Sequence, residues 1–138
     1  FVFVMEKFNQ IYAQIRKINK MDPATAEHRF AKLGEEFGEL AKALNKTNGQ
    51  KVLKSKDTPQ AIRKEILYEA ADTIQKVVSL IDCFKISAPE LLNALLEKNK
   101  DWKKKIVDGK RGPSVKNETH SQAEKIVNKK KKVKKEDE

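Results

Sequence analysis

Apolar residues recur along this chain at the three- to four-residue spacing typical of α-helices. The first such series consists of Val4, Phe8, Ile11, Tyr12, Ile15 and Ile18. It predicts a helix over about residues 5–19. No segment shows the strict apolar-polar alternation of a half-buried strand, and no segment repeats another. The pattern therefore predicts an all-α protein.

Start and stop signals predict where the next two helices lie. Asp22-Pro23 combines an N-cap with proline at the first helical position, and Asn48-Gly49 is a stop signal. Together they predict a second helix that ends at about residue 46. Thr58-Pro59 repeats the cap-and-proline signal. It predicts a third helix from there to about residue 84.

The same kind of signal predicts a fourth helix and the end of the domain. Ser87-x-x-Glu90 is a capping box, and it opens a helix that runs to about residue 107 before Gly109. Apolar content collapses after Pro113, and the run NKKKKVKKEDE has nothing to bury. We therefore expect a four-helix bundle-like domain over residues 1–113 and a disordered Lys-rich tail over residues 114–138.

Length and composition favour a soluble protein of one domain. The chain has 138 residues, and none of its apolar runs approaches the roughly 20 residues that cross a bilayer. Residues 1–5, FVFVM, are too short for a secretory signal, and Met5 is the expected natural start. The single cysteine, Cys83, excludes an intramolecular disulfide and fits a reducing compartment. We expect a cytoplasmic protein, or a nuclear one if the tail is a targeting signal.

The net charge of +10 is spread over both predicted regions. Residues 1–113 hold 22 lysines and arginines against 15 acidic residues, and the tail holds 8 against 5. Part of the excess in the first region lies in residues 98–111, KNKDWKKKIVDGKR. Such a surface favours anionic partners, namely nucleotides, nucleic acid or acidic membranes.

Two acidic pairs stand out against this basic background. Glu36 and Glu39 lie in LGEEFGEL, and Glu69 and Asp72 lie in LYEAADTI, each pair three residues apart on one helix face. Most such pairs are solvated surface charge. On a helical wheel, however, Glu36 and Glu69 fall at the margin of the apolar stripe and their partners one step outward. These positions favour a role at a seam between two helices.

Four carboxylates that converge at such a seam require a cation, because they cannot all stay ionised beside one another. If the second and third helices are antiparallel neighbours, the two pairs can meet. All-oxygen ligation favours Mg²⁺ first and Mn²⁺ second. No Cys/His cluster competes for zinc, and the Glu-x-x-His motif of di-iron bundles is missing.

The two motifs, E-x-x-E in KLGEEFGELAKAL and E-x-x-D in EILYEAADTIQKVVSLI, resemble the MazG-like family. These proteins are all-α nucleoside triphosphate pyrophosphohydrolases, and the likeness covers about residues 28–103. It implies Mg²⁺-dependent cleavage of an NTP or dNTP to the monophosphate and pyrophosphate, by a homodimer or homotetramer. We expect no membrane partner. By position, the implied metal ligands are Glu36, Glu39, Glu69 and Asp72. Glu35 would orient or deprotonate the attacking water.

The substrate phosphates and base call for further contacts. Lysines suited to the phosphates are Lys32, Lys76, Lys98 and Lys103, although each alone is more often a solvated charge. Asn99 could bond a base edge or cap nearby backbone. Trp102 could stack on a base or anchor a core or a subunit interface. EKNKDWKKK, which holds several of these residues, resembles a later feature of the family.

Two features depart from the family pattern and leave alternatives open. The gap between the carboxylate motifs is long, because of a polar insertion around residues 49–58 that is either a lid or a loop. The basic tail lies outside the family core. An alternative function is a non-catalytic helical protein that binds nucleic acid through residues 98–111 and the tail. That alternative leaves the carboxylates unexplained, and base and sugar preference stay open.

Overall fold

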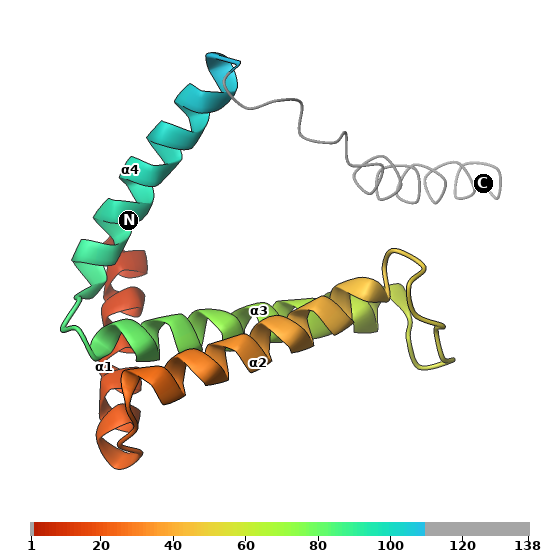
Figure 1. Ribbon diagram of the computed structural model, residues 1–138, viewed down its shortest axis with the longest axis horizontal. Helices are drawn as coiled ribbons and strands as arrows, with labels where there is room; N and C mark the ends of the chain where they lie inside the picture. The colour runs from red at the N-terminus through yellow and green to blue at the C-terminus, as the bar shows by residue number, and fades with distance from the viewer. Residues whose placement is uncertain (1, 110–138) are drawn as a thin grey trace. The chain divides into compact units, whose positions relative to one another are not determined.

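The computed structural model describes residues 2–109, which form four α-helices and no strand (Figure 1). The helices are α1 (Val2–Met21), α2 (Ala26–Asn45), α3 (Pro59–Asp82) and α4 (Ala88–Val107). The all-α, four-helix prediction is therefore confirmed. Residues up to 96 belong to one compact unit, and the described residues 97–109 belong to a second. The predicted tail lies outside the described residues.

Two of the predicted helix starts are confirmed by their caps. The Thr58 hydroxyl accepts a hydrogen bond from the Ala61 backbone N–H at 3.1 Å, with Pro59 in the first turn of α3. At α4, the Ser87 N–H donates to Glu90 Oε2 at 2.8 Å, and the Glu90 N–H donates to Ser87 Oγ at 3.4 Å. These reciprocal bonds form the predicted capping box.

The predicted start of the second helix at Asp22-Pro23 is wrong by a few residues. The N-cap of α2 is Thr25, whose hydroxyl accepts from the His28 N–H at 3.2 Å. Asp22 instead closes α1, because its N–H still donates to the Ile18 carbonyl at 2.9 Å. The first helix also begins at Val2, before the predicted residue 5.

The helices α2 and α3 run antiparallel side by side, and α1 crosses α3 near the carboxyl end of α3 (Figure 1). A small core at this crossing joins Tyr12 and Ile15 of α1 to Val78 of α3 and Ala88 at the start of α4. Along the α2/α3 pair, Leu33, Ala43 and Ile62 are buried. This packing fixes which faces of α2 and α3 meet.

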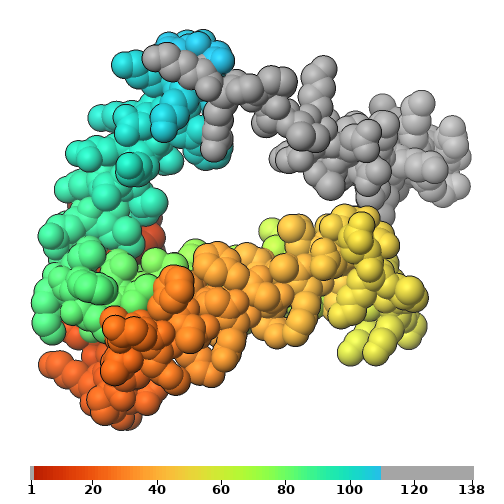
Figure 2. Space-filling model, viewed as in Figure 1, coloured from red at the N-terminus to blue at the C-terminus, as the bar shows by residue number. Residues whose placement is uncertain are grey.

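The loop of residues 46–58 lies at the end of the α2/α3 pair away from α1 (Figure 2). It is tied down by Lys46, whose Nζ contacts Asp57 Oδ1 at 3.1 Å and Glu65 Oε2 at 2.7 Å. The side chains of Lys46 and Asp57 are only 12% and 8% exposed. The long gap between the carboxylate motifs is therefore a loop anchored to α3 by an ion-paired lysine.

Much of the apolar stripe on α2 and α3 is not covered within the described chain. Phe30, Phe37 and Leu44 of α2 and Leu67 and Ile74 of α3 are all more than half exposed. None of the helices described within residues 2–109 is long and apolar enough to cross a membrane.

Candidate metal centre and active site

Three of the predicted carboxylates converge at the seam between α2 and α3. Glu36, Glu69 and Asp72 each offer one oxygen atom, and these atoms lie within 4.8 Å of one another. Glu36 and Glu69 are half-buried, while Asp72 and the fourth predicted ligand, Glu39, are exposed. This is the order of burial that the helical wheel predicts. No ion pair within residues 2–109 involves any of the three converging side chains.

Burial of apolar residues at helical spacing turns these carboxylates toward the seam. Ala43 lies seven residues after Glu36, and Ile62 lies seven residues before Glu69. Residues seven apart are two turns apart on the same helix face. Since Ala43 and Ile62 are both buried, α2 and α3 must direct Glu36 and Glu69 to the same side as the core.

The converging side chains create a concentration of negative charge. The pKa of Glu69 is raised, first by burial and then by the nearby charges of Asp72, Glu39, Glu36 and Glu65. A divalent cation would offset this repulsion, and three carboxylate oxygens so close together match the ligands that hard ions prefer. The residues present therefore fit a Mg²⁺ or Mn²⁺ site.

Glu39 lies at the edge of this cluster and outside the group of three. Its Oε1 accepts a hydrogen bond from Lys42 Nζ at 2.7 Å, and both side chains are more than half exposed. Its charge still reaches Glu69, where it contributes to the raised pKa. Glu39 would have to release Lys42 before it could bind a metal ion with the other three.

Glu35, the predicted catalytic residue, is held by Lys32. Lys32 Nζ donates to Glu35 Oε2 at 2.9 Å. This hydrogen bond and the lysine's charge are the main causes that lower the pKa of Glu35, with smaller contributions from His28 and Lys76. Glu35 is therefore ionised near neutral pH, as a proton acceptor must be, and Lys32 and Lys76 lie close enough to act on it electrostatically.

The predicted substrate contacts on α4 line a pocket of their own. Asn99, Trp102 and Lys103 surround a shallow pocket of about 380 Å³ together with Ile106 and Val107. Trp102 is 54% exposed, so it is not a core residue of its unit. The predicted Lys98 is exposed and does not line this pocket. The structure thus brings together three of these four predicted contacts.

Residues 6–99 match the family model for phosphoribosyl-ATP pyrophosphohydrolase, which covers well over half of the 138 residues. The chain belongs to this family. The matched range includes α2 and α3 with both carboxylate motifs. The family is a MazG-like, all-α group of nucleotide pyrophosphohydrolases, so the resemblance inferred from the two motifs is confirmed. Neither a curated protein nor a solved structure gives a match.

Membership of this family makes the chain a pyrophosphohydrolase acting on a nucleotide-like substrate. The match ends at Asn99. Trp102 and Lys103 therefore lie just beyond the part of the chain that the family model describes. Of the predicted site residues, the carboxylates, Glu35, Lys32 and Lys76 all lie well inside the match.

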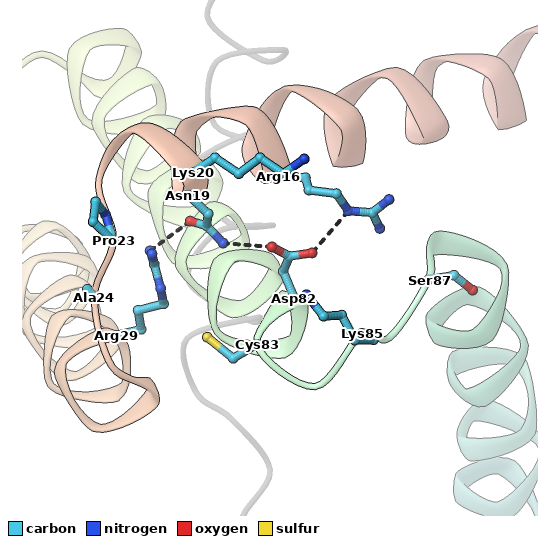
Figure 3. Close-up of a pocket in the computed structure, with 10 residues that line it drawn as sticks. All are labelled: Arg16, Asn19, Lys20, Pro23, Ala24, Arg29, Asp82, Cys83, Lys85 and Ser87. Atoms are coloured by element: carbon cyan, nitrogen blue, oxygen red, sulfur yellow. Dashed lines mark hydrogen bonds and ion pairs between the residues drawn. The ribbon is translucent and has the colours of Figure 1, made fainter.

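Sequence reasoning missed a polar network at the end of the α2/α3 pair that meets α1. Arg29 of α2, Asn19 and Arg16 of α1, and Asp82 of α3 are joined by hydrogen bonds (Figure 3). One signal was available in the sequence, since Arg29 lies seven residues before Glu36 and so shares its helix face. Nothing in the sequence indicates that Asn19 and Asp82 would meet it.

Proposed function

We propose that this chain is a Mg²⁺-dependent pyrophosphohydrolase that cleaves the α–β phosphoanhydride of a nucleoside triphosphate, NTP or dNTP, to the monophosphate and pyrophosphate. The observation that carries the proposal is the convergence of Glu36, Glu69 and Asp72 within a family of nucleotide pyrophosphohydrolases. A triphosphate is itself a good ligand for a divalent cation. The proposed site therefore accounts for a basic protein that gathers carboxylates at a helix seam.

The residues that would hold the ion are Glu36, Glu69 and Asp72, with Glu39 joining once it releases Lys42. When bound, Mg²⁺ would neutralise charge that develops on the phosphate oxygens during attack, and Mn²⁺ could substitute. Ionised Glu35 would accept a proton from the attacking water. Lys32 and Lys76 would then donate hydrogen bonds to phosphate oxygens that the ion leaves uncovered.

A second candidate substrate is phosphoribosyl-ATP, because it is the molecule named in the description of the matching family. Hydrolysis would break the same phosphoanhydride bond and use the same carboxylates. The two candidates differ in the group attached to the base, which lies far from the reacting phosphates. The proposed chemistry at the carboxylates is therefore shared, and only the recognition of the remote part of the substrate separates them.

A substrate panel tests the proposal. The full chain would be incubated with each common NTP and dNTP and with phosphoribosyl-ATP, in Mg²⁺ and separately in Mn²⁺. We expect release of pyrophosphate from at least one substrate, at a rate that chelation with EDTA abolishes. Release of orthophosphate would contradict α–β cleavage, and absence of any product over the whole panel would contradict the function itself.

We further propose that the active form is a homodimer or homotetramer. Support comes from the apolar side chains that α2 and α3 leave more than half exposed, including Phe37 and Ile74. Large apolar side chains left exposed on packed helices are typical of subunit interfaces. Light scattering coupled to size-exclusion chromatography should give twice or four times the 15.8 kDa chain mass. A particle of one chain mass at micromolar concentration would contradict this.

A further inference from the structure

The compact unit of residues up to 96 contains a second charged site, where the amino end of α2 meets the carboxyl end of α3. A pocket of about 680 Å³ opens there (Figure 3). It is lined by residues of α1, α2 and α3, of the segment between α1 and α2, and of the segment that follows α3. Its charged lining residues are Arg16, Lys20, Arg29, Lys85 and Asp82. Four cations thus face one carboxylate.

The carboxylate is fully engaged by its neighbours. Asp82 Oδ1 accepts from Arg16 Nε at 3.1 Å, and its Oδ2 accepts from Asn19 Nδ2 at 3.1 Å. Burial favours a raised pKa for Asp82, but these hydrogen bonds and the charges of Arg16 and Lys85 outweigh it and lower the pKa. Asp82 is therefore a stable anion that neutralises one of the four cations.

Arg29 is held without a carboxylate. Its Nη1 donates to Asn19 Oδ1 at 2.7 Å and to Ser79 Oγ at 2.8 Å, and its Nη2 donates to the Asp22 backbone carbonyl at 2.8 Å. All three acceptors belong to neutral groups. Its Nε is buried and has no hydrogen-bond partner among the described residues. The pocket therefore keeps a rigid, half-buried guanidinium whose charge is not compensated.

A desolvated cation with only neutral partners is unfavourable on its own, and an anion in the pocket would relieve that cost. The surrounding groups are suited to supply further donors. Lys20 and Lys85 are exposed at the pocket and form no ion pair within residues 2–109, while Arg16 binds Asp82 through Nε alone. Guanidinium and ammonium groups together are the usual partners of phosphate.

We propose that this pocket is a binding site for a phosphate monoester, separate from the carboxylate cluster. The excess of three positive charges suits a group that carries close to two negative charges at neutral pH. Arg29 lies seven residues before Glu36, and Ser79 lies seven residues after Asp72. Two helical turns, or roughly 10 Å, therefore separate the pocket from the carboxylates along both helices.

The phosphate could come from either of two sources. One is a substrate with a second phosphate remote from its triphosphate, such as the phosphoribosyl group of the family's named substrate, and this source rests on the proposed function. The other is an independent phosphorylated ligand. Binding itself does not depend on turnover, so it can be tested even if the chain hydrolyses none of the substrates in the panel.

The test of binding is an NMR titration of the full chain with inorganic phosphate, in Mg²⁺-free buffer at constant ionic strength. We expect saturable shifts in the side-chain Nε–H resonances of Arg16 and Arg29 and in the Ser87 amide. An equal ionic strength of chloride should cause none. Unsaturable shifts, or shifts confined to residues outside the pocket, would overturn the proposal.

Two double variants distinguish phosphate binding in the pocket from a general effect of positive charge. Lys20→Gln with Lys85→Gln removes two lining cations that are exposed, so the fold should persist, and it should weaken phosphate binding by about tenfold or more. The control, Lys17→Gln with Lys51→Gln, removes the same charge from exposed positions that do not line the pocket. Equal weakening by both double variants would overturn the proposal.

Steady-state kinetics then identify the source. If the phosphate belongs to the substrate, Lys20→Gln with Lys85→Gln should raise KM for phosphoribosyl-ATP by about tenfold and leave KM for ATP unchanged. If it belongs to an independent ligand, both KM values should stay unchanged while the loss of phosphate binding persists. An equal rise in both KM values would show instead that the lysines act on the triphosphate, and it would overturn a separate site.

Discussion

The middle of the α2/α3 pair and its end beside α1 treat buried charge in opposite ways. In the middle, Glu36, Glu69 and Asp72 approach one another with no ion pair among the described residues. At the end beside α1, Arg29 is bonded to neutral acceptors and Asp82 to Arg16 and Asn19. The first arrangement brings like charges together, whereas the second fixes each charged group with hydrogen bonds and leaves an excess of positive charge.

The neighbours of the carboxylate cluster sharpen this difference. Glu35 and Glu39 lie on the same helix as Glu36, yet each pairs with a lysine three residues away, at 2.9 Å and 2.7 Å. Such exposed pairs satisfy charge locally and contribute little else. The contrast teaches that three carboxylates are brought together without a compensating lysine or arginine at the seam of α2 and α3, which is where a cation would bind.

Glu69→Gln should have the largest effect, and it should disrupt only the carboxylate cluster. Loss of a central ligand should lower kcat/KM for the preferred substrate by more than about 100-fold, because losing a group that merely orients a metal ligand can already cost that much. The variant should also lose the rise in melting temperature that Mg²⁺ gives the parent chain. Without metal its stability should equal or exceed that of the parent, since like-charge repulsion is removed.

Glu97→Gln is the matched control for that substitution, because Glu97 is exposed on α4 and has no ion pair within the described residues. It should keep both the activity and the Mg²⁺-dependent rise in melting temperature. Substantial pyrophosphate release by Glu69→Gln, or retention of its response to Mg²⁺, would remove the carboxylate cluster from the proposed mechanism.

Asn19→Ala should disrupt the polar network beside α1, and it should act mainly on the stability of the fold. Asn19 donates to the Ser79 carbonyl and to Asp82, and it accepts from Arg29. Its loss removes one hydrogen-bond partner from each of two partly buried charged groups, Arg29 and Asp82, so the free energy of unfolding should fall by about 2 kcal/mol. Urea denaturation would measure this change, with the exposed Asn93→Ala as control. A change within about 0.5 kcal/mol would show that the network does not stabilise the fold.

Features of the chain set by local sequence could be predicted, and those set by distant contacts could not. The Thr58 cap, the Ser87–Glu90 capping box and the acidic pairs each lie within one helical turn. The network at Arg29 joins residues 10 and 63 positions apart along the chain, which no periodicity connects. The Asp22 backbone carbonyl, beside the misplaced start of α2, belongs to the same network as an acceptor for Arg29.

The convergence of the carboxylates could be predicted for a second reason. The three side chains come from two antiparallel neighbouring helices, so the margin of each apolar stripe identifies the seam. Glu39 shows the limit of this reasoning, since a helical wheel cannot decide whether a side chain will reach across the seam or turn back to Lys42 on its own helix. That choice depends on the energy of an exposed ion pair and on whether a cation is present.

Asp82→Asn tests the carboxylate of the polar network. It should lower the free energy of unfolding less than Asn19→Ala does, because the introduced amide can still accept a hydrogen bond. The pKa of Asp82 is lowered in the folded chain, against burial, by its bonds to Asn19 and Arg16. Its contribution to stability is therefore present above the unfolded pKa of about 3.9 and lost as pH falls through the lower folded value. Parent and variant should differ most near neutral pH and converge in acid. A difference in unfolding free energy that stays constant between pH 7 and pH 3 would contradict this assignment.

Lys42→Gln should give the smallest effect, and it should strengthen cation binding at the carboxylate cluster. The substitution frees Glu39 from its 2.7 Å hydrogen bond and removes a positive charge that acts on Glu69. Since exposed charges are screened, Mg²⁺ affinity should rise by only roughly two- to fivefold. Calorimetric titration with Mg²⁺ would measure it, against Lys51→Gln, which removes the same charge from the exposed loop. Unchanged affinity in Lys42→Gln would mean that Glu39 stays outside the metal site, which would then consist of the three converging carboxylates.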